Sequence, residues 1–268
     1  MNTISLNSVT ENNLQLEEIY KSLRANVQFS GKEVKTIVFT SCIPNEGKST
    51  VVVELGISLA QAGKKTLIID ADLRKSVLAS RHKTERNTKG LSQLLSGNST
   101  IEETLNKTNI PNLHLILSGP FPPNPAELLG SETMKNLLKS ARSAYDYVLI
   151  DMAPLGSVID AAVVAPMVDG VVMVVCSGEI KYRFAQDVKE LLERANAHIL
   201  GVVLNKVDQG RYSAYASYGG YYGKYYGKYY GSYYGSGSSK DGKKHHKRSF
   251  LQRLFRKKHH HHSSKSAK

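Results

Sequence analysis

Short apolar runs alternate with longer amphipathic stretches between residues 34 and 204. The longer stretches carry apolar residues at helical spacing and are predicted helices at 49–63, 131–145 and 179–196. The apolar runs are predicted strands at 34–41 (VKTIVFTS), 66–70 (TLIID), 113–117 (LHLIL), 147–151 (YVLID), 171–176 (VVMVVC) and 199–205 (ILGVVLN). Near-continuous apolar strands are typical of a parallel sheet buried on both faces. The pattern therefore predicts the α/β class, with a doubly wound, mostly parallel sheet and helices on both faces.

A different composition follows where the alternating pattern ends, near Asp208. Residues 212–234 contain 11 of the chain's 15 tyrosines, and glycine recurs at every fourth position from 219 to 235. Since each glycine costs about 1 kcal/mol in a helix and also weakens a strand, this segment is predicted to be disordered. The predicted divisions are an N-terminal helix (1–30), an α/β domain (31–210), a tyrosine cluster (211–235) and a basic, disordered tail (236–268).

The formal net charge of +13 belongs mostly to the C-terminal tail. Residues 236–268 contain 11 Lys and Arg against the single Asp241, so the rest of the chain is close to neutral. The basic balance therefore does not indicate nucleic-acid binding. Within the tail, SFLQRLFR (249–256) has its apolar residues on one helical face. Peripheral contact with an anionic membrane and a plain solvated tail are both compatible with that segment.

Cysteine use and hydropathy indicate a cytoplasmic protein. The two cysteines, Cys42 and Cys176, do not make a disulfide framework and fit a reducing compartment. The first residues lack the charged-then-apolar pattern of a signal peptide. No apolar run is long enough to span a bilayer.

A candidate phosphate-binding loop, SCIPNEGKST (41–50), lies between the first long strand and the first long helix. The order strand, Gly-Lys-Ser/Thr, helix is the context of a P-loop, in which backbone N–H groups and a helix N-terminus face the phosphates. Lys48 would bind the β- and γ-phosphates and Ser49 the Mg²⁺ ion. Cys42 stands where the P-loop pattern has glycine. The predicted nucleotide-binding residues of the loop are Pro44, Asn45, Glu46, Gly47, Lys48, Ser49 and Thr50.

Three aspartates, Asp70, Asp72 and Asp151, stand at the ends of two further predicted strands. An aspartate at a strand end commonly does no more than cap the next turn. Beside a P-loop, however, carboxylates have a second role, because Mg²⁺ prefers phosphate, water and one or two carboxylates. We therefore expect Asp151 to be a Mg²⁺ partner and the fold to be of the P-loop NTPase type.

The stretch LIIDADLR (67–74) contains an Asp-x-Asp-x-Arg pattern that an ordinary P-loop ATPase lacks. With EGKST, LIDMAP, GVVLNKVD, GPFPPNPAELL and the tyrosine cluster, it resembles the bacterial tyrosine kinases of the CpsD/CapB kind, autokinases of capsule and exopolysaccharide assembly. The resemblance covers about residues 15–208. It implies ATP and Mg²⁺ as cofactors, Asp70 in the magnesium shell and Asp72 as the base toward the acceptor phenol. It also places Asn205 near the adenine, and makes GPFPPNPAELL an active-site loop followed by a helix.

Three residues depart from the motifs of that family: Cys42, Asn45 and Met152. We expect these three departures to alter the detailed geometry of the site more than the activity. The family resemblance also gives the tyrosine cluster a purpose that a flexible linker would not have, as the phosphoacceptor of an ATP-dependent protein-tyrosine autokinase. The implied acceptors are Tyr212, Tyr215, Tyr218, Tyr221, Tyr222, Tyr225, Tyr226, Tyr229, Tyr230, Tyr233 and Tyr234.

The segment EEIYKSLRANVQF (17–29) resembles the oligomerisation motif Glu-x-x-Arg-x-x-Arg of the same family, with Glu18, Lys21 and Arg24 in its three positions. Spacing of three keeps these residues on one helical face, although lysine lacks the planar fork of arginine. The alternative is a solvated helix face. The resemblance further implies a ring of subunits, a membrane adaptor of the polysaccharide co-polymerase type that recruits the protein to the inner face of the membrane, and a cognate tyrosine phosphatase.

The main alternative is an ATPase switch of the MinD/ParA kind without kinase activity. Those proteins share a second lysine five residues before the P-loop lysine, where this chain has Ile43. The tyrosine cluster would also have no role in such a switch. A non-enzymatic polyanion-binding protein would leave the three aspartates unexplained.

Overall fold

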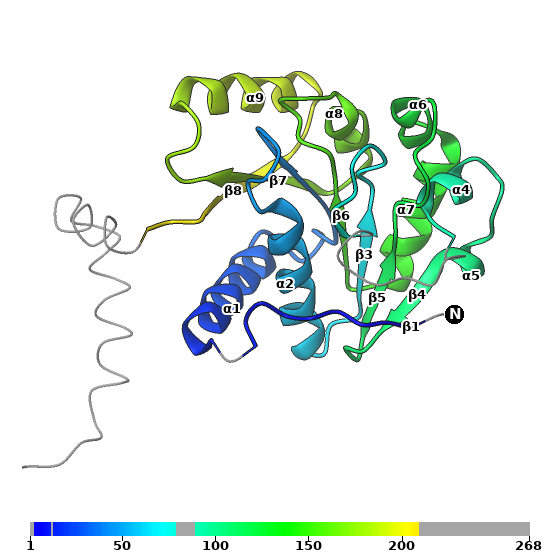
Figure 1. Cartoon of the computed structure of the whole chain (residues 1–268), viewed down its shortest axis with the longest axis horizontal. Coiled ribbons are helices and arrows are strands. Elements are labelled where there is room, and N and C mark those ends of the chain that lie inside the picture. Colours follow the sequence, from blue (N-terminus) through cyan, green and yellow to red (C-terminus); the bar gives the residue numbers. More distant parts are fainter. Residues whose placement is uncertain (1–2, 12, 79–88, 209–268) are drawn as a thin grey trace, which may run out of the picture. The chain divides into compact units, whose positions relative to one another are not determined.

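The computed structural model describes residues 3–11, 13–78 and 89–208 (Figure 1). Contacts group residues Met1–Gln209 into one unit. The predicted tyrosine cluster and the basic tail lie outside the described residues. No helix in the described ranges is long and apolar enough to cross a membrane.

One sheet of eight strands organises the described residues, in the order β1-β4-β5-β3-β6-β2-β7-β8. All six predicted strands are confirmed, as β2 (Thr36–Ser41), β3 (Thr66–Asp70), β5 (Leu113–Ile116), β6 (Tyr147–Asp151), β7 (Gly170–Cys176) and β8 (Ile199–Asn205). They pair in parallel with one another, so their carboxyl ends share one edge. The predicted doubly wound α/β class is confirmed.

Two strands were missed: β1 (Thr3–Ile4) and β4 (Leu105–Thr108). β4 pairs antiparallel to β5, and β1 pairs parallel to β4. β1 has only two residues, and the LNKT sequence of β4 has one apolar side chain. Neither has an apolar pattern of its own, so only pairing with a neighbour defines them as strands.

Helices α1 (Leu14–Phe29) and α2 (Lys48–Gln61) cover one face of the sheet (Figure 1). The Asn13 side chain accepts a hydrogen bond from Leu16 N and caps α1. Along β2, Ile37 and Phe39 pack on the α2 side, and both are fully buried. Because side chains alternate along a strand, Val38 between them belongs to the opposite core.

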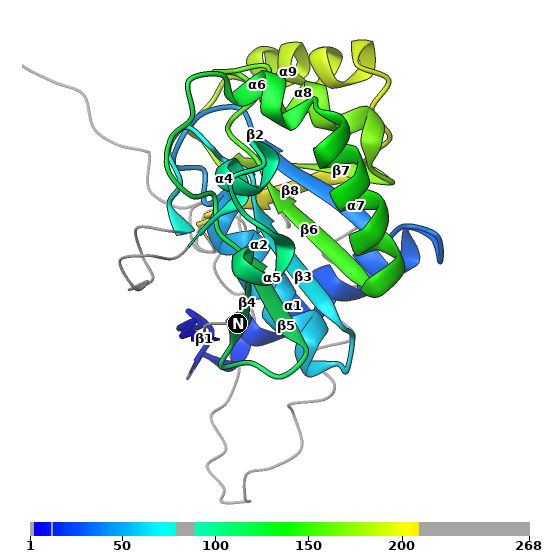
Figure 2. The same cartoon turned by 90° about the vertical axis from the view of Figure 1, so that its right-hand side faces the viewer.

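The opposite face is covered by α7 (Glu132–Ala144), α8 (Asp160–Val164) and α9 (Tyr182–Arg194), and Figure 2 shows this layer from the side. The Ser131 hydroxyl caps α7 by accepting from Met134 N. The predicted long helices are confirmed. The missed short elements are α4 (Leu91–Leu95), α5 (Ile101–Thr104), α8 and the 3-10 helix η1 (Ala165–Met167). The last five residues of GPFPPNPAELL form α6 (Pro125–Leu129), so the expected helix directly follows the loop of residues 119–124.

Candidate active site

The loop between β2 and α2 has P-loop geometry. Asn45 and Gly47 both have left-handed backbones, with φ of 68° and 85°, and Gly47 N-caps α2. A Cβ atom at Gly47 would lie 2.1 Å from the Asn205 Nδ2 atom. Glycine is therefore required at this position for two reasons, its backbone conformation and the close approach of Asn205.

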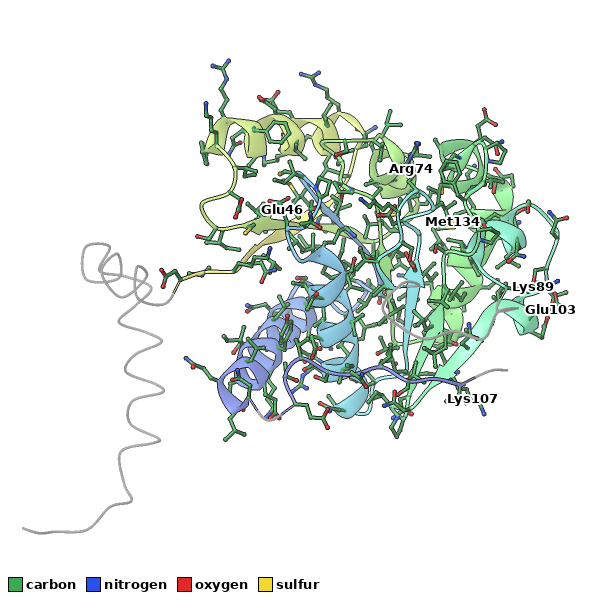
Figure 3. All side chains as sticks on the ribbon, viewed as in Figure 1. Glu46, Arg74, Lys89, Glu103, Lys107 and Met134 are labelled. Atoms are coloured by element: carbon green, nitrogen blue, oxygen red, sulfur yellow. The ribbon has the colours of Figure 1, made fainter. Side chains whose placement is uncertain are left out.

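Glu46 holds this loop through its buried side chain. One carboxylate oxygen accepts hydrogen bonds from Cys42 N at 2.6 Å and from Ile43 N at 2.9 Å. The other accepts from Cys176 N, at the end of β7, at 2.9 Å. Both carboxylate oxygens thus accept hydrogen bonds from the backbone. Glu46 could therefore bind a phosphate through its backbone N–H group and not through its side chain. Figure 3 labels Glu46 on this edge of the sheet.

The end of β8 supports the same loop from its other side. The Asn205 amide donates to the Glu46 carbonyl at 2.8 Å, and Lys206 Nζ donates to the Asn45 carbonyl at 2.7 Å. Asn205, predicted to lie near an adenine, therefore contacts the P-loop backbone directly. The contact of Lys206 was not predicted, because no sequence pattern singles out a lysine that caps a loop carbonyl.

Lys48 and Asp151 form a buried ion pair at the start of α2 and the end of β6. Lys48 Nζ also lies 3.5 Å from Ser49 Oγ. The lysine predicted to bind phosphate and the carboxylate and hydroxyl predicted to bind Mg²⁺ are thus brought together. In this arrangement the Asp151 carboxylate neutralises the buried Lys48 ammonium.

Asp70 is fully buried beside this pair, since it is the register partner of Asp151 in the neighbouring strand. Ser76 Oγ donates to one Asp70 oxygen, and the other oxygen has no hydrogen-bond partner among the described residues. Burial and the neighbouring Asp151 charge raise the pKa of Asp70 to about 7. A buried carboxylate oxygen without a partner is costly, which fits a site built for a cation.

No group of three or more His, Cys, Asp or Glu side chains that could hold a metal occurs in the described ranges. Magnesium does not need one, because it keeps water and substrate phosphate as ligands and takes one or two carboxylates from the protein. Asp70, Asp151 and the Ser49 hydroxyl supply the oxygen donors that such an ion prefers. The residues present therefore fit Mg²⁺ bound together with a nucleotide.

Asp72 stands just beyond the end of β3, and its Oδ1 atom accepts from Arg74 N at 3.2 Å and from Lys75 N at 2.9 Å. These two hydrogen bonds close a tight turn and fix the orientation of the Asp72 carboxylate. The Arg74 guanidinium, labelled in Figure 3, forms an ion pair with Asp160 at the start of α8. The proximity of Asp70, Asp72 and Asp151 was predicted, whereas the pairing with Asp160 was not.

A family model described as an AAA domain matches residues 34–199. The tyrosine-protein kinase CpsD of Streptococcus agalactiae is 42% identical over 205 residues, which are 76% of this chain and 89% of CpsD. The chain belongs to the bacterial tyrosine-protein kinases. The predicted family is thereby confirmed.

Several solved structures are similar to this kinase. The kinase domain of the Escherichia coli tyrosine kinase ETK has a TM-score of 0.72 and 31% identity, covering 76% of this chain and 81% of that domain. The chimerical protein CapA2B2 has a TM-score of 0.71 and 35% identity, covering 78% and 94%. The septum site-determining protein MinD of Pyrococcus horikoshii, complexed with Mg-ADP, has a TM-score of 0.55 and 24% identity, covering 66% and 72%, so its likeness concerns the fold alone.

Two of the three departures from the family motifs are core residues of the kinase. Cys42 and Met152 are both fully buried in the core on the α7–α9 side. Burial raises the pKa of the Cys42 thiol to about 12, and the nearby Glu46 charge acts in the same direction. Neither side chain is a candidate for the chemistry. Asn45, the third departure, is exposed and uses a left-handed backbone that asparagine tolerates.

The predicted oligomerisation residues lie on α1. Lys21 forms ion pairs with Glu17 at 2.8 Å and Glu18 at 2.9 Å on the helix surface. Arg24 donates to the Ser58 carbonyl at 2.7 Å and the Ser58 hydroxyl at 3.1 Å, which ties α1 to α2 within one chain. Arg24 therefore has an intramolecular partner that the motif did not predict. Assembly into a ring stays a prediction.

Proposed function

We propose that this kinase transfers the γ-phosphoryl group of Mg·ATP to tyrosine side chains, including the eleven of its own cluster between residues 212 and 234. One observation carries the proposal. Lys48, Asp70, Asp72 and Asp151 converge at the carboxyl edge of the sheet, where a buried Asp70 oxygen has no partner among the described residues. In this proposal Asp72, whose carboxylate is held in a turn by Arg74 N and Lys75 N, is the group that takes the proton of the acceptor phenol.

Lys48, the N–H groups of residues 44–50 and the N-terminus of α2 bind the phosphates in the proposed mechanism. Lys48 exchanges its ion pair with Asp151 for one with the phosphates. Asp151, Ser49 and Asp70 would then supply the oxygen donors that hold a magnesium ion beside the phosphates. The bound ion would neutralise charge on the phosphates during transfer. Asn205 fixes the P-loop and the adenine side of the site.

Asp72 acts as the base. A free phenol has a pKa of about 10 and is a poor nucleophile at neutral pH unless a carboxylate takes its proton during transfer. The phenol oxygen forms a bond to the γ-phosphorus while the bond to the bridging β,γ-oxygen breaks and ADP leaves. The phenol proton passes to the Asp72 carboxylate. Charge on the transferring group is stabilised by Lys48 and the loop N–H groups.

The cellular setting is proposed from the relatives. Members named CpsD and CapB indicate a role in regulating capsule or exopolysaccharide synthesis. We include a membrane adaptor that brings the kinase to the inner face of the membrane, a cognate phosphatase, and a homo-oligomeric ring formed through α1. The basic tail offers peripheral contact with anionic lipid.

The test is incubation with labelled ATP and Mg²⁺, with and without a candidate adaptor, followed by mapping of phosphotyrosines. A Lys48→Met chain with an intact tail serves as the acceptor for a chain truncated after Gly210, so that donor and acceptor are separate molecules. We expect label on the tyrosine cluster of the Lys48→Met chain. Release of inorganic phosphate without any labelled tyrosine would favour the ATPase switch.

A further inference from the structure

Arg74 and Asp160 form an ion pair with two parallel hydrogen bonds. Arg74 Nε lies 2.7 Å from Asp160 Oδ2, and a terminal guanidinium nitrogen lies 2.9 Å from Oδ1. Asp160 is fully buried, whereas the Arg74 side chain is 35% exposed. The planar fork of arginine fixes the orientation of such a pair as well as its distance.

The pair holds the turn that follows β3. Arg74 and Lys75 donate their backbone N–H groups to the Asp72 carboxylate, and Ser76 donates its hydroxyl to Asp70. The direction of the Asp72 carboxylate therefore depends on where the backbone of residues 74 and 75 lies. The guanidinium of Arg74 links that backbone to Asp160, the first residue of α8.

A contribution to the stability of the fold does not by itself explain why Arg74 and Asp160 are paired. A buried ion pair is commonly no more stabilising than apolar side chains of similar volume, because both charges lose water. Among the described residues, Arg74 supplies both hydrogen bonds that Asp160 accepts. By contrast, Asp169 pairs with Arg142 at the other edge of the sheet and also binds Lys35 N, Thr36 N and the Thr36 hydroxyl.

We propose that Asp160 is a positioning residue for phosphotransfer. By holding Arg74, it fixes the turn whose two N–H groups orient the Asp72 carboxylate toward the acceptor phenol. The inference rests on the proposed function, in which Asp72 is the base. Asp160 itself touches neither nucleotide nor phenol, and its effect passes through Arg74.

The kinetic test uses Asp160→Asn, which keeps the size of the side chain and removes its charge. We expect kcat to fall roughly tenfold to a hundredfold because a misplaced catalytic group costs about that much. The KM for ATP should stay within about twofold, since the P-loop contacts are untouched. In a chain that already carries Asp72→Asn, Asp160→Asn should lower kcat no further. Asp160 acts only by orienting the Asp72 carboxylate, and that carboxylate is then absent.

Arg74→Lys is the milder second variant, because it keeps the charge beside Asp160 and removes the fork. Its matched control is Arg142→Lys, which changes an arginine of similar exposure, 39%, in the pair with Asp169 at the amino edge. We expect Arg74→Lys to lower kcat and Arg142→Lys to leave it unchanged. Equal losses of kcat in the two variants would overturn the inference.

Hydrogen exchange of a peptide spanning residues 71–78 tests the same idea without catalysis. Exchange should be faster in Asp160→Asn than in the wild-type chain, with the P-loop peptide unchanged. Unchanged exchange at 71–78, or an equal loss of kcat with and without Asp72, would overturn the inference. A wild-type chain that labels no tyrosine would instead overturn the proposed function, and hydrogen exchange would then still decide whether Asp160 holds the turn.

Discussion

The two edges of the sheet each hold an aspartate at a strand end, and the surroundings of these two residues are opposite. Asp169, directly before β7 at the amino edge, accepts hydrogen bonds from Lys35 N at 3.0 Å, from Thr36 N at 2.9 Å and from the Arg142 guanidinium at 3.1 Å. Asp70, at the carboxyl edge, accepts one from Ser76 and leaves an oxygen without a described partner.

The pKa values of the two carboxyls move in opposite directions. Burial alone would raise the pKa of Asp169, but the hydrogen bonds from Thr36 and Lys35 outweigh it and hold that pKa below its ordinary value. Burial and the Asp151 charge raise the pKa of Asp70 to about 7. Asp169 is therefore satisfied within the chain, whereas Asp70 has one oxygen without a partner among the described residues.

The largest contrast should come from one lysine at each edge. Lys48→Met should lower phosphotransfer about a thousandfold or more, because it removes the charge that faces the phosphates. The variant should remain folded, with a lower Tm since Asp151 loses its partner. Lys65→Met removes an ammonium that lies 4.9 Å from the centre of the Tyr145 ring, and should leave activity unchanged. Labelled-ATP assays and circular dichroism measure both. Retained activity in Lys48→Met would contradict the site.

The second-largest difference between the two edges should be in the Mg²⁺ dependence of nucleotide binding. In Asp151→Asn, we expect the Mg²⁺ concentration needed for nucleotide binding to rise about tenfold to a hundredfold, because one donor to the ion loses its charge. Isothermal titration with ADP at several Mg²⁺ concentrations measures this shift. Asp169→Asn is the control at the other edge and should show the wild-type dependence. The same shift in both variants would mean that it reflects general destabilisation.

For the free energy of unfolding, we expect the aspartate at the amino edge to matter, although it does not matter for activity. Asp169→Asn weakens charge-assisted hydrogen bonds that join β2, β7 and α7, so the free energy of unfolding should fall by about 2 to 3 kcal/mol. Urea unfolding followed by circular dichroism measures the change. Activity per folded molecule should stay at the wild-type level. A loss of activity without a loss of stability would place Asp169 in the catalytic machinery after all.

The smallest expected effect is a difference in pH dependence without Mg²⁺. Because the pKa of Asp70 is raised to about 7, the native state holds more protons than the unfolded state between the ordinary value and 7, and stability falls as pH rises through that window. Relative to Asp70→Asn, the wild-type chain should lose about 1 to 2 kcal/mol between pH 6 and pH 8.

Asp169 should behave differently in the same experiment. Its lowered pKa stabilises the fold at every pH above its ordinary value, and that contribution is lost only in acid, as pH falls through the native pKa. The difference between wild type and Asp169→Asn should thus be constant from pH 5 to pH 8. Parallel pH curves for all three chains would remove the proposed contrast between the edges.

Local pattern was enough to predict most of the sheet and to single out candidate site residues that the fold brings together. Six strands have apolar runs of their own, and Lys48, Asp70 and Asp151 follow strand ends that had to meet at one edge once the sheet was parallel. β4 was missed because its LNKT sequence lacks apolar periodicity and it is defined by pairing with β5. α8 was missed because it has only five residues.

The sequence by itself determined the class of fold, the phosphate-binding loop and the identity of the acids, because these depend on periodicity and on the order of neighbouring residues. The tertiary structure alone decided which charges meet. Lys48 pairs with Asp151 across 103 positions, and Arg74 with Asp160 across 86. Glu46 binds Cys176 N across 130. The sequence contains many other acids, bases and N–H groups that could have been these partners. Folding determines the actual partners, because it removes water and brings groups distant in the sequence within 3 Å of each other.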